Sequence, residues 1–303
     1  MIDRREQAAL LALTEASPAP WHEVADLVED AGSVMAVLEG TAQSYTQKGT
    51  ELLAELVRQT TPAMVDSWIS TIEMTLEQLP DVSLITVLDP EYPENLRRIY
   101  NRPPFLFVRG QLIDEDNRSV AVVGTRRASP EGRKRARFLA TALAQRGVTV
   151  VSGLAAGIDT SAHSGALEGG GRTVAVMGTG IDRTYPADNA ALAERIAAHG
   201  ALISQFWPGT PPRATNFPLR NVVTSGMAVG TVVIEASGKS GARMQARLAL
   251  EHGKRVLLMK DLVMQEEWAQ LYERRGAKVV ESVEDILAVL DAERSVPTAL
   301  QLF

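Results

Sequence analysis

Two apolar segments in the middle of the chain each end in a turn whose residues could bind an anion. The first turn consists of Gly124, Thr125, Arg126 and Arg127 and comes directly after the apolar segment 120–123. An arginine guanidinium donates paired hydrogen bonds to phosphate oxygens, and a helix that begins at such a turn adds free backbone amides. We therefore interpret the turn as a phosphate-binding element, with exposed arginines on a solvated helix face as the alternative.

The second turn contains Ser152, Gly153, Gly157 and Asp159 and follows another short apolar segment. Two glycines four residues apart, with small residues between them, let the backbone approach a ligand closely. We expect the residues of this turn to face the same ligand as the first turn. The alternative is structural: Asp159 would cap the following helix, and His163 would pack beside it.

A basic loop leads to a further helix start. Arg213 stands in the loop, and Arg220 and Asn221 stand at the expected start of the helix 221–227. A helix start favours phosphate because its first amides have no partner within the helix. An asparagine cap beside an exposed arginine is the structural alternative.

The segment EASGKSGA is a glycine-rich loop between the expected strand 231–234 and the expected helix 241–252. Ser240 and Gly241 would supply backbone donors to a phosphate, and Lys239 would supply a countercharge. The pattern G-x-x-x-x-G-K-[ST] is absent, so the sequence does not support ATPase activity.

The elements that position these turns alternate between apolar strands and amphipathic helices over residues 81–292. This alternation predicts a doubly wound α/β sheet, in which ligands bind outside the carboxyl ends of the strands. Residues 1–80 lack strand-like alternation and predict a small all-helical domain. Residues 293–303 are expected to form a short tail.

The charge is unevenly distributed along the 303 residues, whose net charge is −6. Residues 1–80 hold 13 acidic and 4 basic residues, residues 81–303 hold 24 and 27, and residues 97–147 hold 4 and 12. A locally basic segment permits a polyanion site, whereas the acidic total argues against indiscriminate coating of DNA.

The sequence lacks the residues that several classes of function require. The chain has no cysteine, its four histidines are scattered, and no serine stands on a nucleophile elbow, so we expect no metal, no cofactor and no catalysis. No apolar run is long enough to span a membrane, which predicts a cytoplasmic protein without a membrane partner.

Read in order, the motifs resemble the DNA-processing protein A family, also called DprA or Smf. They are DPEYPENL, RPPFLFVRG, VAVVGTRRAS, VVSGLAAGIDTSAHSGAL, TVAVMGTGIDRTYPADN, FPLRN and VVIEASGKSGA. The resemblance implies an extended Rossmann-like domain with a small, SAM-like helical N-terminal domain. It also implies a homodimer that binds and protects incoming single-stranded DNA and helps load a RecA-type recombinase in recombination and natural transformation, without catalysis.

The family's DNA-contacting residues can be carried over onto matching positions. The arginine of its G-[ST]-R motif falls on Arg126, and Arg213 provides a basic residue shortly before the F-P-x-R-N motif. The remaining matches are the Arg-Asn pair of that motif and the glycine-rich loop, at Arg220, Asn221, Ser240 and Gly241.

The chain also departs from the family pattern. Val222 replaces a second arginine after the Arg-Asn pair, and Gln205 replaces a glutamate. The family's S-G-S-[LM]-x-T-A reads SGARMQA, so Gln245 stands at the threonine position. The usual glycine-rich segment beyond Met259 is missing, and we expect the protein to lack the family's winged-helix domain.

Two other functions stay open. The first is a nucleotide-binding sensor of the wider superfamily of Smf-like and lysine-decarboxylase-like Rossmann proteins, with a pocket narrowed by the loss of the second arginine. Hydrolysis of a nucleotide is not expected, because Arg243, Met244 and Gln245 stand where the hydrolases carry a catalytic glutamate. The second is a scaffold whose acidic helical domain recruits a partner.

Overall fold

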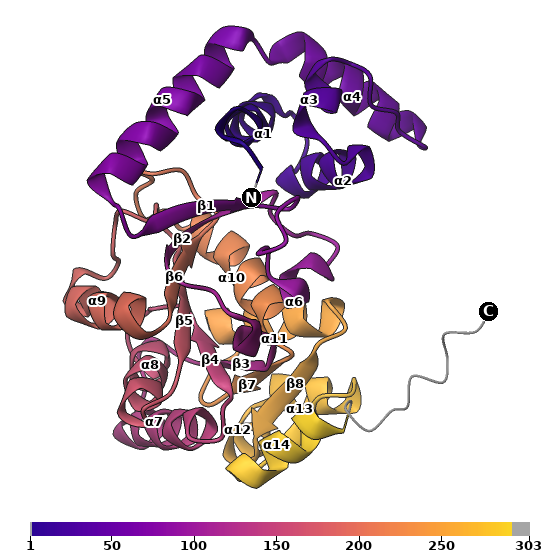
Figure 1. Cartoon of the computed structure of the whole chain (residues 1–303). Helices are drawn as coiled ribbons and strands as arrows, with labels where there is room; N and C mark the ends of the chain where they lie inside the picture. The colour runs from indigo at the N-terminus through magenta and orange to yellow at the C-terminus, as the bar shows by residue number, and fades with distance from the viewer. Residues whose placement is uncertain (1, 293–303) are drawn as a thin grey trace.

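The computed structural model describes residues 2–292, and the first part of this chain is entirely helical. The start of α5 shows a local cause: the hydroxyl of Thr61 accepts a hydrogen bond from the Met64 amide, and Pro62 takes the first helical position, where its missing amide costs no bond. These helices lie together beyond one edge of the sheet (Figure 1). They are α1 (Arg4–Ala16), α2 (Trp21–Ala31), α3 (Val34–Leu38), α4 (Gln47–Gln59) and α5 (Pro62–Gln78).

One nine-stranded sheet forms the rest of the framework, in the order β1-β2-β6-β5-β4-β3-β7-β8-β9. The strands from β6 to β9 in this order run parallel, and β2 is antiparallel to both its neighbours. The central strands are buried on both faces, which explains their continuous apolar sequences. The strands are β1 (Val82–Thr86), β2 (Phe105–Gly110), β3 (Ser119–Val123), β4 (Thr149–Ser152), β5 (Thr173–Val176), β6 (Ala201–Ser204), β7 (Gly230–Val233), β8 (Arg255–Met259) and β9 (Lys278–Val280).

Helices cover both faces of the parallel sheet, with α7, α8 and α9 on one face and α10 and α11 on the other (Figure 1). This arrangement confirms the predicted doubly wound α/β fold with a helical N-terminal region. The division of the chain at residue 80 stays a prediction, and the expected tail 293–303 lies outside the described residues. The helices are α6 (Glu94–Arg97), α7 (Pro130–Ala144), α8 (Ile158–Glu168), α9 (Ala190–His199), α10 (Asn216–Met227), α11 (Gly241–Glu251), α12 (Lys260–Gln265), α13 (Glu267–Arg274) and α14 (Val283–Asp291), with 3-10 turns η1 (Asp114–Asn117) and η2 (Ala187–Asn189).

Three helices differ from the sequence expectation. α10 begins at Asn216, five residues before the expected start, because Pro218 falls in the first turn, where a helix does not need its amide. The sequence pattern also predicts a helix over 161–168, whereas α8 begins at Ile158. It predicts a single helix over 264–275, whereas the structure has two helices there, with Glu266 in an extended conformation between them.

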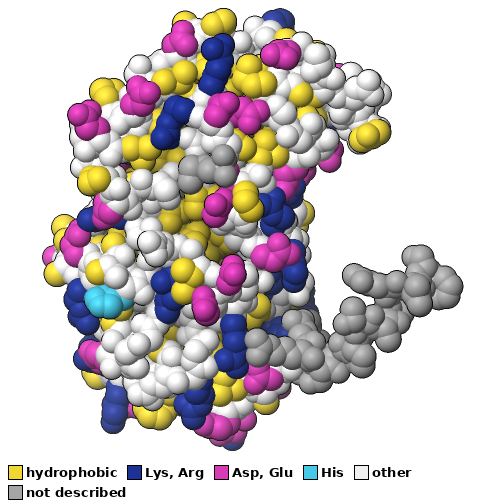
Figure 2. All heavy atoms as spheres, viewed as in Figure 1, with side chains coloured by type: hydrophobic (Ala, Val, Ile, Leu, Met, Phe, Trp, Pro, Cys, Tyr) yellow, Lys and Arg dark blue, Asp and Glu magenta, His cyan; other side chains and the backbone are white. Residues whose placement is uncertain are grey.

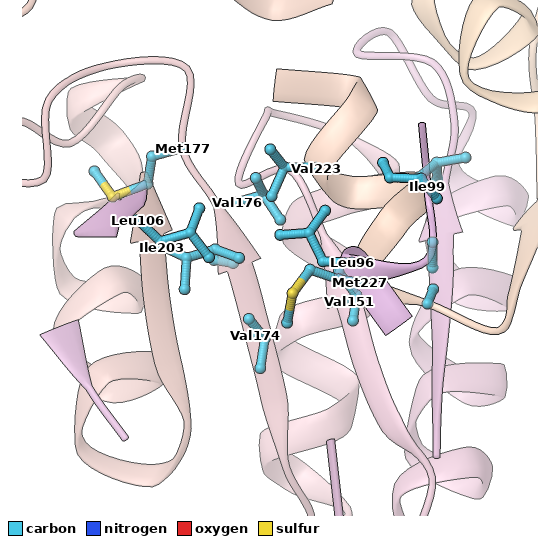
Figure 3. Packing of buried hydrophobic residues seen from close by; sticks show 14 of the residues in the cluster. Leu96, Ile99, Leu106, Val151, Val174, Val176, Met177, Ile203, Val223 and Met227 are labelled. Carbon is cyan, nitrogen blue, oxygen red and sulfur yellow. The ribbon is translucent and has the colours of Figure 1, made fainter. Parts of the chain in front are cut away.

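Buried side chains hold α10 against the sheet (Figure 3). Val223 and Met227 of α10 are at most 1% exposed and lie among Val174 and Val176 of β5 and Leu96 of α6, which are equally buried. Dense packing of this kind resists small displacements. The helix that carries Arg220 is therefore a rigid support.

An aromatic cluster joins the helical region to the sheet. Trp207, in the loop after β6, lies 4.6 Å from Trp68 of α5 and 5.2 Å from Trp21 of α2, measured between ring centroids, and stacks on Phe105 of β2 at 4.7 Å. Pairs of aromatic rings at such distances add to the energy of area burial. The cluster fixes the loop after β6 as well as the helices above it.

The two regions differ in surface charge. Acidic side chains are scattered over the helical region in Figure 2, whereas most of the Lys and Arg side chains visible in this view lie lower, around the sheet. Among residues 2–292, no helix combines the length and the apolar character that crossing a membrane requires.

Candidate functional site

The order of the strands reverses direction at β3, because β4, β5 and β6 add on one side of it and β7, β8 and β9 on the other. Doubly wound sheets bind ligands in the crevice at this reversal, outside the carboxyl ends of the strands. A cavity of about 390 Å³ lies there. Its wall includes the predicted residues Gly124, Thr125, Arg126, Arg127, Gly153, Asp159, Arg220, Asn221, Ser240 and Gly241.

Four predicted residues lie near this wall without forming it. Ser152 is fully buried, and its hydroxyl donates to the Val122 carbonyl at 2.7 Å, so it ties β4 to β3. Arg213 and Lys239 are exposed on the loops before α10 and α11. Gly157 lies outside the wall and packs against the backbone of Thr125 and Arg126.

Gly157 lets α8 begin directly under the first turn. Its φ is +84°, and a Cβ at this position would stand 2.5 Å from the carbonyl oxygen of Thr125 and 2.7 Å from that of Arg126. Any larger residue would combine a strained backbone with a clash. The glycine therefore holds the two predicted turns in contact, and it does not line the cavity as the sequence predicted.

Arg126 and Phe217 form the exposed edge of the cavity. The guanidinium carbon of Arg126 lies 4.6 Å from the centroid of the Phe217 ring, within cation–π range. The contact holds the guanidinium plane beside the ring while leaving its donors accessible. Such a pair can receive a phosphate on one component and stack a base on the other.

Arg220 is buried, contrary to the alternative of an exposed arginine beside an asparagine cap. Its side chain lines the cavity, Nη1 donates to the Val176 carbonyl at 3.1 Å, and Nε has no partner among the described residues. Gly153 makes this position possible, because a Cβ there would stand 1.5 Å from Nη1. Burial lowers the pKa of Arg220, the Asp159 carboxylate raises it, and Arg126 lowers it again.

Asp159 and His163 extend along α8 behind this arginine. Burial raises the pKa of Asp159, which Arg220 and the hydrogen bond from the Ala155 amide lower. His163 is fully buried, and burial followed by the charge of Arg220 lowers its pKa to about 3. Its Nδ1 lies 2.7 Å from the Thr173 hydroxyl. Asp159 thus braces the second turn and lines the cavity, while the histidine is packed in the core.

The loops after β3 and β7 are bound to each other through Glu235. Its carbonyl accepts from the Thr125 amide at 2.7 Å, and its carboxylate accepts from the Ser129 hydroxyl at 2.7 Å. The Ser129 hydroxyl also accepts from the Gly132 amide at 2.9 Å and caps α7. The turns after β3 and β7 are therefore held in place by hydrogen bonds within the protein, before any ligand binds.

Among the wall residues that the sequence did not predict for the site, Phe217 carries a ring and Gln245 an amide. Phe217 stands inside the FPLRN motif, where its type alone could have identified a stacking surface. Gln245 is 2% exposed on the first turns of α11, and its place in the glycine-rich motif, at the family's threonine position, is the signal that could have identified it. Chemically, the wall combines cationic side chains with an aromatic ring and open backbone turns. Across residues 2–292, no three His, Asp or Glu side chains gather as a metal site.

The model of the DNA recombination-mediator protein A family matches residues 83–291. Protein Smf of Synechocystis is 38% identical over 221 residues, which are 71% of this chain and 56% of the relative, so the chain spans less than two thirds of that protein.

Two solved structures share the fold. DNA processing protein A from Streptococcus pneumoniae superimposes with a TM-score of 0.73 at 30% identity, over 95% of this chain and 98% of that one. DNA processing protein A from Helicobacter pylori, described for its single-stranded DNA binding mode, superimposes with a TM-score of 0.62 at 25% identity. The match covers 70% of this chain and 96% of that one. The ordered motifs, the sheet and these matches agree, and the chain belongs to the DNA recombination-mediator protein A family, the DprA or Smf proteins.

Proposed function

We propose that this protein binds single-stranded DNA at the cavity beside β3 and β7. The observation that carries the proposal is the convergence of Arg126, Arg127 and Arg220 with Phe217 at one edge of the sheet. Single-strand binders combine cationic side chains that follow the phosphates with rings on which bases stack. The relative from Helicobacter pylori, whose description names such binding, supports this reading.

The wider role that we propose follows the family. The protein protects incoming single strands and assists a RecA-type recombinase during recombination and natural transformation, as a cytoplasmic homodimer that acts by binding and without catalysis. The cavity wall supports a binding role, because it offers hydrogen-bond donors and a ring.

The test is a titration of labelled single-stranded and duplex oligonucleotides at two salt concentrations, followed by fluorescence anisotropy. Arg126→Glu is expected to weaken single-strand binding at least tenfold and to reduce the slope of log K against log salt by about 0.7, the contribution of one phosphate contact. Arg195→Glu makes the same charge change on α9, outside the cavity wall, and controls for net charge. Tight binding that Arg126→Glu leaves unchanged would contradict the site.

A nucleotide sensor is the second candidate, and one observation favours it. The cavity of about 390 Å³ falls within the range of small-ligand sites, and Val222 stands where the family pattern has a further arginine. A thermal-shift panel separates the candidates: a sensor is stabilised by a mononucleotide at micromolar concentration, whereas a strand binder responds to oligo-dT and not to the mononucleotide.

A further inference from the structure

The wall of the cavity contains a buried amide without a partner. Gln245 is 2% exposed, and neither its Oε1 nor its Nε2 has a hydrogen-bond partner among the described residues. Nε of Arg220, in the same wall, is likewise unpartnered. Buried polar atoms are almost always hydrogen-bonded, and leaving them unpaired is costly. Three such atoms at one cavity indicate that a ligand supplies the partners.

Three polar neighbours in the wall have hydrogen-bond partners of their own. The Thr224 hydroxyl donates to the Arg220 carbonyl at 3.2 Å, and the Ser240 hydroxyl caps α11. The Asp159 carboxylate accepts from the Ala155 amide. None of the three is hydrogen-bonded to the amide of Gln245, whose terminal torsion is soft and can turn either atom toward the cavity.

The unpartnered atoms define the chemistry of the ligand. Nε2 of Gln245 and Nε of Arg220 need acceptors, whereas Oε1 of Gln245 needs a donor. Phosphate oxygens are acceptors only and would leave Oε1 unpaired. The edge of a nucleobase presents a donor and an acceptor side by side, and a glutamine amide pairs with such an edge through two hydrogen bonds.

We propose that Gln245 binds the edge of one nucleobase of the bound strand, so that the cavity receives a base as well as phosphate. This inference rests on the proposed binding of single-stranded DNA. The base enters past Phe217 and Arg126, whose paired ring and guanidinium stand at the exposed edge. Bases unstacked from a single strand are held in this way, by stacking and by hydrogen bonds to their edges. A threonine, which the family pattern has at this position, offers only one hydroxyl.

The experiment compares two strands of equal length, one with natural bases and one with abasic tetrahydrofuran units, by anisotropy on the full chain. Gln245→Leu keeps the bulk of the side chain and removes both hydrogen bonds. The variant is expected to bind the natural strand about tenfold more weakly, because it loses one bidentate contact to a base. It is expected to bind the abasic strand with the affinity of the wild type. Gln270→Leu makes the same chemical change on α13, outside the cavity wall, and is expected to change neither affinity.

Each outcome decides a separate point. An equal loss on both strands, or no loss on either, overturns the role of Gln245 while DNA binding stands. If wild type binds neither strand, the proposed function itself fails. Melting temperatures establish that the variants fold, and Gln245→Met, a residue of similar length without hydrogen bonds, replaces the leucine variant if that variant does not.

Discussion

Replacing Gly153 by alanine tests whether the buried guanidinium of Arg220 is part of the site. The added Cβ would stand 1.5 Å from Nη1 and 2.2 Å from Cζ of Arg220. Since Cβ contacts below 3.0 Å are essentially never seen, the guanidinium must move by about the difference between 1.5 and 3.0 Å. Its hydrogen bond to the Val176 carbonyl, now 3.1 Å, does not survive such a shift.

The magnitude follows from this one bond. A hydrogen bond to a charged group contributes about 1.5–3 kcal/mol, so Gly153→Ala is expected to lower the free energy of unfolding by about 2 kcal/mol. For a chain of 303 residues this lowers the melting temperature by about 3 °C. Displacement of the guanidinium from its place in the cavity wall is expected to weaken single-strand binding about tenfold.

Calorimetry and anisotropy on the same preparations check both numbers. Gly238→Ala is the control, because Gly238 does not have a positive φ, its nearest heavy atom to a new Cβ is 3.8 Å away, and it does not line the cavity. A Gly153→Ala protein that melts and binds as wild type does would refute the reasoning. It would mean that Arg220 finds an equivalent position and that its observed placement has no function.

Two further predictions concern the regions around the site. Burial lowers the pKa of His163 to about 3 in the folded protein, against 6.5 in the unfolded chain. Between these pH values the unfolded state binds a proton that the folded state does not. The free energy of unfolding therefore falls as the pH drops from 6.5 toward 3, by about 1.4 kcal/mol per pH unit from this group. His163→Asn should flatten the dependence in urea titrations across that range, and an unchanged slope would mean that the histidine does not titrate as its burial implies. Trp68→Ala removes the ring that lies 4.6 Å from Trp207 and the hydrogen bond from its Nε1 to Glu15. We therefore expect the free energy of unfolding to fall by about 2 kcal/mol and the tryptophan emission to change. Identical emission would indicate that the aromatic cluster does not form.

The placement of the two glycine-containing turns could be predicted from the sequence, because it depends on local pattern and one topological rule. Gly124 and Gly153 each follow a short run of apolar residues, and such runs flanked by helices form parallel strands. The carboxyl ends of parallel strands meet at one edge, so turns 29 residues apart in the chain become neighbours. Ser129 and Pro130 likewise indicate the start of α7 from local sequence alone, because one caps the helix and the other is its first residue.

The burial of Arg220 and the exposure of Arg126 could not be predicted. Both are arginines beside glycine-containing motifs, and their environments differ because of contacts from distant segments. Gly153 leaves space for one guanidinium under β4, whereas Phe217 of α10 holds the other at the surface. The unpaired amide of Gln245 depends in the same way on what surrounds it in space.

Because Arg220 is buried and Arg126 is exposed, we expect the two arginines to contribute to binding in different ways. Exposed cations attract a strand over a distance, but salt weakens their effect because the Debye length at 0.15 M is about 8 Å. A buried guanidinium is screened much less, and its geometry is fixed before the ligand arrives, since the Val176 carbonyl and the packed α10 hold it. The salt dependence of binding should therefore come from Arg126 and Arg127 at the surface. The affinity that persists at high salt should come from Arg220 and from contacts that carry no net charge.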